Sequence, residues 1–229
     1  MKPPGHPVPS GDREIARLTI RALEQAGREV RTVSDLRLLE KTGEPAAQAA
    51  LVAAAEAETM RLLRDLAENP PRLWFTYHCY YKAPDLLGPA VSTALRIPYV
   101  ISEPSIAPRR RTGAWAGFAK ASEGAIAAAD LLLWTTGRDR PALEDTGHGA
   151  RMAHLPAFID VGAPVRNRPA NRPPRLLTVA MMRHGDKLES YRRLSAGLRG
   201  VAGDWDLDVI GAGPARAEVV AMFANHSSR

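Results

Sequence analysis

Helix-forming and strand-forming segments alternate along most of this 229-residue chain, and this alternation sharply limits the folds available to it. Amphipathic stretches typical of helices cover residues 11–26, 45–68, 84–96 and 115–129. Short apolar runs typical of buried strands cover residues 28–34, 72–78, 98–102, 131–136 and 152–160. Strands separated by helices pair in parallel, and the crossover helices then cover both faces of the sheet. The pattern predicts an α/β protein with a Rossmann-like, doubly wound parallel sheet.

The composition changes at Val161. Residues 161–174, VGAPVRNRPANRPP, combine Pro, Arg and Asn with few apolar side chains, which is typical of an interdomain linker. Strand, helix, strand and helix are then expected at 175–181, 187–200, 205–211 and 214–224. We therefore predict an N-terminal domain over 1–160 and a second Rossmann-like domain over 175–229. Two strands form only a small sheet, so the second domain is expected to be truncated. No strand precedes the first helix, so the first domain is expected to lack its first strand.

The charge balance favours acidic partners. Lys and Arg outnumber Asp and Glu by 31 to 25, which gives a net charge of +6 and suits phosphates, nucleic acid or an anionic membrane surface. The single cysteine, Cys79, excludes an internal disulfide and shares no zinc-ligand spacing with the six histidines. No apolar run approaches the roughly 20 residues that span a bilayer, and the N-terminus lacks the apolar core of a signal peptide. We expect a cytoplasmic protein.

The segment 208–220, DVIGAGPARAEVV, has the look of a dinucleotide-binding fingerprint. Gly211 and Gly213 supply the first two small residues of that motif, but the third position holds Arg216, a long cation where backbones should touch. The ribose-binding acid, expected about 20 residues further on, would lie beyond the last residue. A strand, a glycine turn and a helix with no cofactor role explain the segment equally well.

Four further segments carry a resemblance to a known family. They read HPVPSGDREIARLTIRALEQAGREV, YHCYYKAPDLLGP, TVAMMRHGDK and WDLDVIGAGPARAEV, and together with the two-domain pattern the chain resembles a GT-B fold retaining glycosyltransferase of family 4. The resemblance implies an acceptor-side first domain and a second domain that binds a nucleotide-diphosphate sugar, with no metal or other cofactor. It also implies that the Gly-x-Gly-Pro turn is structural. The family's pair of Glu residues seven apart, which holds the sugar and ribose, lies further along than this chain reaches.

The resemblance implies a donor diphosphate site made by Gly11, Arg183 and Lys187. Negative charge grows on the leaving diphosphate in the transition state, and fixed cations aimed there lower the barrier. Lys187 falls in the first turn of its predicted helix, where it would join the free backbone N–H groups. By spacing alone, Arg183 and Lys187 are also consistent with ordinary surface charges. Gly11 either lets the backbone approach a phosphate or serves the turn after Pro9.

On the acceptor side, His78 and Glu103 are the candidate catalytic residues. Both follow predicted parallel strands, at whose carboxyl ends ligands gather in open sheets. Glu103 stands where family members often carry a His, so it either contacts the sugar or pairs with the arginines that follow. Arg109, Arg110 and Arg111 are candidates for binding an anionic acceptor, and a solvated loop is the alternative.

Arg13, Arg17 and Arg21 recur every fourth residue and share one face of the first helix. The resemblance implies peripheral contact of this face with the inner face of a membrane, and an exposed charged face with no partner is the simpler alternative. We expect a glycosyltransferase whose acceptor the sequence does not identify, with a lipid-linked molecule and a polysaccharide as the candidates. This chain is expected to be a weak or inactive fragment with no nucleic acid partner. The alternatives are a non-catalytic α/β module that binds an anionic partner or membrane surface and, less favoured, a dinucleotide-binding oxidoreductase.

Overall fold

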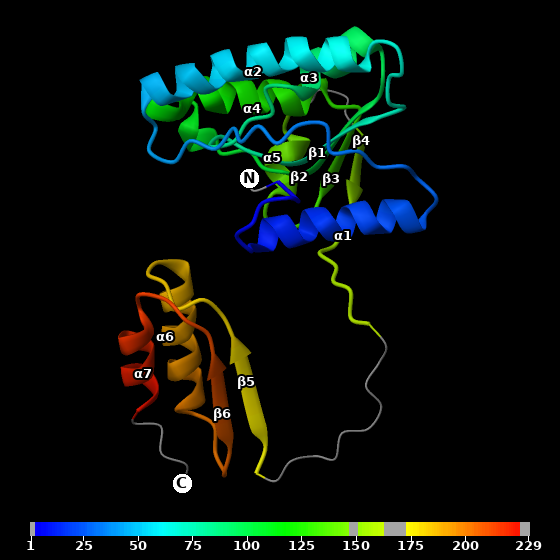
Figure 1. Cartoon of the computed structure of the whole chain (residues 1–229). Helices are drawn as coiled ribbons and strands as arrows, with labels where there is room; N and C mark the ends of the chain where they lie inside the picture. Colours follow the sequence, from blue (N-terminus) through cyan, green and yellow to red (C-terminus); the bar gives the residue numbers. More distant parts are fainter. Residues whose placement is uncertain (1–2, 147–150, 163–172, 225–229) are drawn as a thin grey trace. The chain divides into compact units, whose positions relative to one another are not determined.

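A computed structural model of the chain describes residues 3–146, 151–162 and 173–224 (Figure 1). The chain divides into two compact units, Met1–Val161 and Gly162–Arg229. Most of the predicted linker, residues 163–172, lies outside the described residues, as do residues 225–229.

The first unit is built on a parallel sheet. Its described strands are β1 (Trp74–Cys79), β2 (Tyr99–Pro104), β3 (Leu131–Trp134) and β4 (Arg151–His154), hydrogen-bonded in that order. Each neighbouring pair is parallel, as in the register of Ile101 with Leu132. The predicted α/β class with parallel strands is confirmed.

Helices lie on both sides of these strands. The helices are α1 (Gly11–Gln25), α2 (Pro45–Leu66), α3 (Gly88–Leu95), α4 (Ala116–Ala128) and the short α5 (Arg140–Glu144). Figure 1 shows α2, α3 and α4 gathered together, with the strands between them and α1. Pro45 occupies the first position of α2, where its missing N–H costs nothing, and the Ala-rich sequence that follows has a high helix propensity.

Helix α1 is capped at both ends. The Ser10 side chain accepts a hydrogen bond from the N–H of Arg13 at 3.3 Å, which caps the helix. Gly27 takes a positive φ of 74°, and the Arg28 N–H donates to the carbonyl of Leu23 at 3.0 Å, which closes the helix as a Schellman motif. The expected apolar stripe is only partly buried, since Leu18 is covered but the alanines at positions 22 and 26 are exposed.

Two predicted strands differ from the structure. Residues 28–34 form no strand, because no described strand lies beside them to complete a hydrogen-bonded ladder, and Val33 packs against the core from an irregular segment. The last predicted strand, 152–160, ends early. The N–H of Leu155 still donates to the carbonyl of Trp134, but Pro156 has no N–H to continue the pairing with β3.

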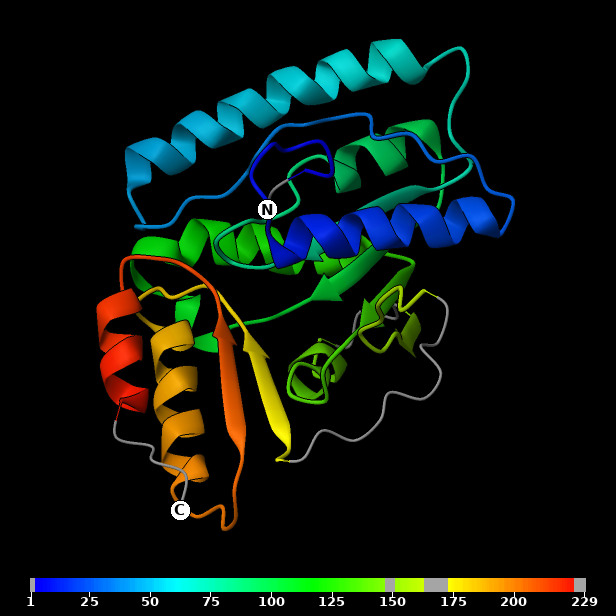
Figure 2. The ribbon, with the colours of Figure 1, turned by 60° about the horizontal axis from the view of Figure 1, so that its bottom comes forward.

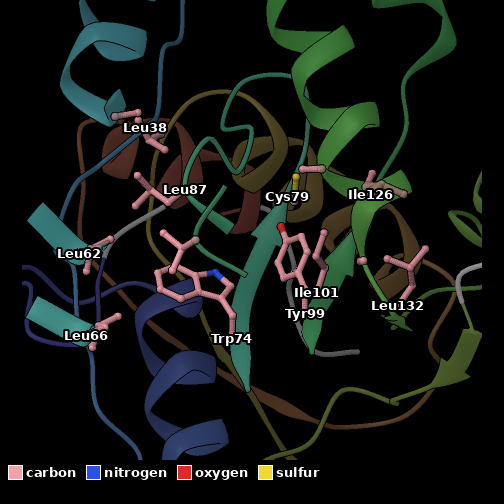
Figure 3. Packing of buried hydrophobic residues seen from close by; sticks show 14 of the residues in the cluster. Leu38, Leu62, Leu66, Trp74, Cys79, Leu87, Tyr99, Ile101, Ile126 and Leu132 are labelled. Carbon is pink, nitrogen blue, oxygen red and sulfur yellow. The ribbon is translucent and has the colours of Figure 1, made fainter. Parts of the chain in front are cut away.

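The core of the first unit lies between the sheet and the α2–α4 layer (Figure 3). Leu62 and Leu66 of α2, together with Ile126 of α4, meet strand residues such as Tyr99 and Ile101, all of them buried. A buried carboxylate, Asp85, lies within this core and fixes the loop after β1.

Asp85 receives four hydrogen bonds. One carboxylate oxygen accepts from the backbone N–H groups of Leu87 at 2.9 Å and Gly88 at 2.8 Å, where α3 begins. The other accepts from the hydroxyls of Tyr99, at 2.6 Å, and Thr76. A methyl group on Gly88 would collide with this carboxylate and with the Tyr99 ring, so the site requires glycine. The loop that joins β1 to α3 is thus anchored at its far end.

The second unit has parallel strands β5 (Arg175–Val179) and β6 (Asp206–Ile210) with α6 (Asp186–Leu198) and α7 (Arg216–Phe223). Figure 2 shows α6 and α7 side by side next to this strand pair. The core is formed by Met182, Leu188, Tyr191, Ala215 and Val219. The face of the strands that bears the Arg175–Asp208 ion pair also exposes Leu177, Val179 and Ile210.

The glycines of the 208–220 segment have a structural reason to be glycine. Beyond the ends of β5 and β6, the N–H of Met182 donates to the carbonyl of Ala212 at 2.8 Å, and the N–H of Ala215 donates to the carbonyl of Met182 at 2.9 Å. A methyl group on Gly213 would collide with that Met182 carbonyl, and one on Gly211 would collide with the carbonyl of Ala180. Two backbone segments approach here at a distance that only glycine permits.

Candidate functional site

His78 and Glu103 lie side by side at the carboxyl ends of β1 and β2. The register pairs Tyr77 with Ser102, so the next residues along face each other. The Nδ1 atom of His78 is 3.8 Å from Oε1 of Glu103, an ion-pair distance when the imidazole is protonated. The sequence placed each residue at a strand end but gave no sign that the two are neighbours.

Both residues have a strained backbone. His78 has a φ of 67° and Glu103 a φ of 56°, in the left-handed region that favours glycine. Such conformations cost about 1–3 kcal/mol each and cluster at functional sites, where the surrounding structure holds them in place. Two strained, ionisable residues facing each other at the carboxyl edge of a parallel sheet identify the candidate active site of the first unit.

The electrostatics of this pair favour an anionic Glu103. Contact with His78 lowers the pKa of Glu103, partial burial opposes that effect, and a hydrogen bond with Tyr77 adds to it. Burial raises the pKa of the Tyr77 hydroxyl well above its usual range, and the charges of Glu103 and Asp12 raise it further. Among the described residues, the Nδ1 atom of His78 is buried and has no hydrogen-bond partner. The imidazole therefore presents this nitrogen to the Glu103 carboxylate, 3.8 Å away.

A row of aromatic rings leads away from His78. Its ring lies 4.8 Å from that of Tyr80, Tyr80 lies 5.6 Å from Tyr81, and Tyr81 lies 5.4 Å from Trp115, each pair in an edge-to-face arrangement. Tyr77 contacts His78 from the other side at 5.9 Å. The sequence analysis missed this row, although the quoted segment YHCYYK contains most of it and follows a strand.

The start of α1 lies near the aromatic row. Burial is the main cause that raises the pKa of Tyr77 and Tyr80, and the charge of Asp12 raises both further. Gly11, the predicted phosphate-binding glycine, is exposed, and a methyl group there would meet no atom within 4 Å. The conformation of the turn after Pro9 therefore does not demand glycine at this position.

The helix arginines are engaged within the chain. Arg13 donates to the carbonyl of His6 at 2.8 Å, and Arg17 donates to the carbonyl of Pro4 at 2.8 Å. Arg21 pairs with Glu14 at 3.5 Å and with Asp160 at 3.4 Å. The stripe fastens the N-terminal segment to α1.

The three consecutive arginines after β2 have different surroundings. The Nε–H group of Arg111 donates to both carboxylate oxygens of Glu123 of α4, at 2.9 and 3.1 Å. Arg110 lies over the ring of Tyr81, with its Cζ atom 5.2 Å from the ring centre. Arg109 is exposed. Of these three arginines, Arg111 thus has a carboxylate partner, and Arg109 and Arg110 have none among the described residues.

In the second unit, Arg183 and Lys187 flank the N-terminus of α6. Gly185, with a φ of 83°, caps the helix between them, and both side chains are exposed. No carboxylate of the described residues lies within 4.0 Å of either cation, whereas Arg175, Arg192 and Arg193 all have acidic partners. Next to this pair, His184 lies 3.4 Å from Glu218, a contact that the sequence analysis did not predict.

Comparison with protein-family models and with curated protein sequences returns no match for this chain. Among the described residues, no three His, Cys, Asp or Glu side chains cluster as metal ligands would. Every helix in residues 3–146, 151–162 and 173–224 is too short or too polar to cross a lipid bilayer. The structure thus shows an α/β chain with two parallel sheets and one candidate site in each unit.

Proposed function

We propose that this chain belongs to a glycosyltransferase that transfers a sugar from a nucleotide-diphosphate sugar to an acceptor hydroxyl with retention, as the GT-B family-4 resemblance implies. The observation that carries the proposal is the pair Arg183 and Lys187, two cations without acidic partners at the N-terminus of α6. This helix follows the carboxyl end of a parallel strand, which is where α/β proteins bind phosphates.

The chemistry of the donor suits this arrangement. As the bond between sugar and diphosphate breaks, charge accumulates on the departing oxygen, and the N–H groups of the first turn of α6 are oriented to receive it. Arg183 and Lys187 add two full positive charges beside those N–H groups. Asp186 and Glu189 lie in the same first turn, but no carboxylate of the described residues is within 4.0 Å of Arg183 or Lys187, so no ion pair has to be broken before an anion binds there.

His78 and Glu103 would serve the acceptor. With Nδ1 directed toward the Glu103 carboxylate, the opposite imidazole nitrogen, Nε2, can accept a hydrogen bond from the attacking hydroxyl, and Glu103 stabilises the charge that develops on the ring. The rings of Tyr77 and Tyr80 contact the His78 ring and limit its orientation, which lowers the entropy cost of alignment.

The oxidoreductase alternative loses its main argument, because the packing of Gly211 and Gly213 against the 180–182 backbone accounts for both glycines. The non-catalytic alternative, an α/β module that binds an anionic partner, predicts anion binding without nucleotide preference. A binding experiment separates the three.

Titration calorimetry with UDP, GDP and NAD is the test. We expect a nucleoside diphosphate to bind, and Arg183→Gln and Lys187→Gln to weaken it by about 10- to 100-fold each, the effect of losing a charge-assisted hydrogen bond. Arg199→Gln is the matched control, since it removes the same charge from the exposed C-terminal end of α6. Tighter binding of NAD, equal loss in the control, or no nucleotide binding at all would overturn the proposal.

A further inference from the structure

Lys82 and Arg110 come from different loops, and each lies near the ring of Tyr81. The Nζ atom of Lys82 lies 5.8 Å from the centre of the Tyr81 ring and 5.3 Å from that of Trp115, and the Cζ atom of Arg110 lies 5.2 Å from the Tyr81 ring. Lys82 follows β1 and Arg110 follows β2, so both belong to the carboxyl edge of the sheet. We call this group of four residues the aromatic–cation platform.

The two positive charges on this platform are not neutralised by the protein. No carboxylate of the described residues lies within 4.0 Å of Lys82 or Arg110. The acids nearby in the chain are engaged elsewhere: Glu123 pairs with Arg111, and Glu40 accepts hydrogen bonds from Thr42 and Gly43. Burial acts to raise the pKa of Glu40, but these hydrogen bonds outweigh it and lower the pKa to about 2.

The platform is held in place by contacts below it. The carbonyl of Lys82 accepts from the N–H of Glu40 at 3.0 Å, and Tyr80 pairs with Ala83 in a short antiparallel bridge. The Gln48 side chain donates to the carbonyl of Ala114 at 2.8 Å, next to the buried Trp115. The loops that carry the two cations are therefore supported by hydrogen bonds within the protein.

We infer that the aromatic–cation platform binds a phosphate group carried by the acceptor. Lys and Arg donate several charge-assisted hydrogen bonds to phosphate oxygens, and the rings of Tyr81 and Trp115 set where those donors sit. The ring of Tyr80 contacts both His78 and Tyr81, so the platform lies two ring contacts from the candidate catalytic pair. This inference rests on the proposed function and adds to it an acceptor class: a molecule that bears both a hydroxyl and a phosphate.

Two arms of one experiment identify the source of the phosphate. Glucose 6-phosphate, with glucose as its uncharged counterpart, is titrated into the full chain by calorimetry at low salt. In parallel, cosedimentation is measured with phosphatidylcholine vesicles that contain phosphatidic acid and with pure phosphatidylcholine vesicles. Binding of the sugar phosphate indicates a soluble acceptor, and binding of the acidic vesicles alone indicates a lipid headgroup.

Lys82→Gln and Arg110→Gln should each weaken the binding that is observed by about tenfold or more. Lys120→Gln, which removes an exposed charge from α4, should change it less than twofold. Thermal unfolding checks that the variants fold, and Tyr81→Phe keeps the ring and should retain binding. The inference is overturned if neither phosphate probe binds, or if Lys120→Gln weakens binding as much as Arg110→Gln. Arg183→Gln shows whether glucose 6-phosphate binds at α6 instead: loss of binding in Arg183→Gln without loss in Arg110→Gln assigns the probe to the donor site and overturns the inference.

Discussion

Replacing Asp85 with alanine should destabilise the first unit by about 3–5 kcal/mol. The carboxylate accepts four hydrogen bonds in a site that is only 8% exposed. In the alanine variant the Tyr99 hydroxyl, on a side chain 1% exposed, and the N–H groups of Leu87 and Gly88 lose their acceptor. Each buried unsatisfied donor costs about 1–3 kcal/mol, and water entering the space left by the carboxylate offsets part of the sum.

Two matched variants make the reasoning testable by urea denaturation. Tyr99→Phe removes one donor and leaves the other three bonds to Asp85, so it should cost about 1–1.5 kcal/mol. Asp85→Asn keeps one oxygen for the N–H groups of Leu87 and Gly88, and its amide NH2 group can donate to the two hydroxyls. Its cost in stability should therefore fall between those of Tyr99→Phe and Asp85→Ala. The argument fails if Asp85→Ala lies within about 0.5 kcal/mol of the native chain, or if Tyr99→Phe costs more than Asp85→Ala.

Three further predictions concern other parts of the chain. Gly213→Ala should speed amide hydrogen exchange throughout α6 and α7, because the new methyl group collides with the Met182 carbonyl, and exchange at the native rate would contradict this packing. Leu177 and Val179 are 62% and 68% exposed. Replacing both with Thr should lower the fluorescence of ANS, a dye that binds apolar surfaces. An unchanged signal would show that this face is covered in solution. Contact with His78 lowers the pKa of Glu103 below 4.5. The contribution of the ionised Glu103 carboxylate to stability is therefore present above pH 4.5 and is lost as pH falls through the lowered pKa. The stability difference between the native chain and Glu103→Gln should therefore shrink at acid pH, and a difference that grows there would refute the sign.

The parts of the fold that sequence predicts well are those set by local pattern. The Ala-rich run with Pro45 at its start specifies α2, and Ser10 with Gly27 specifies both ends of α1. These signals act over a few residues, so no knowledge of distant contacts is needed. The strand predicted at 28–34 fails for the opposite reason, since a strand exists only where a neighbour accepts its hydrogen bonds, and that neighbour is specified elsewhere in the chain.

The candidate site is harder to predict than the fold. The position of His78 at the end of a predicted strand made it a candidate. Its pairing with Glu103 depends on the register of β1 against β2, which the sequence does not display. The same holds for Lys82 and Arg110, 28 positions apart, which both lie near the Tyr81 ring because two loops leave the same edge of the sheet. The three arginines after β2 look equivalent in sequence, and only the position of Glu123 on α4 separates Arg111 from the others.

The strain at Glu103 offers a way to separate a functional role from a structural one. Its φ of 56° costs a non-glycine residue about 1–2 kcal/mol, and glycine adopts that conformation without the penalty. Glu103→Gly also loses the contact with His78, which is worth little because the Glu103 side chain is about one-third exposed. The variant should therefore be as stable as the native chain or about 1 kcal/mol more stable, while sugar transfer falls sharply.

A residue kept for packing would behave in the reverse way, with stability and activity falling together. Thermal unfolding and a transfer assay on the same preparation distinguish the two cases, and Glu103→Asn, which tolerates the left-handed conformation without supplying a carboxylate, serves as the control for backbone effects. If Glu103→Gly unfolds more easily than the native chain by more than about 1 kcal/mol, the carboxylate contributes to the fold, and its strained backbone gives no reason to assign it to catalysis.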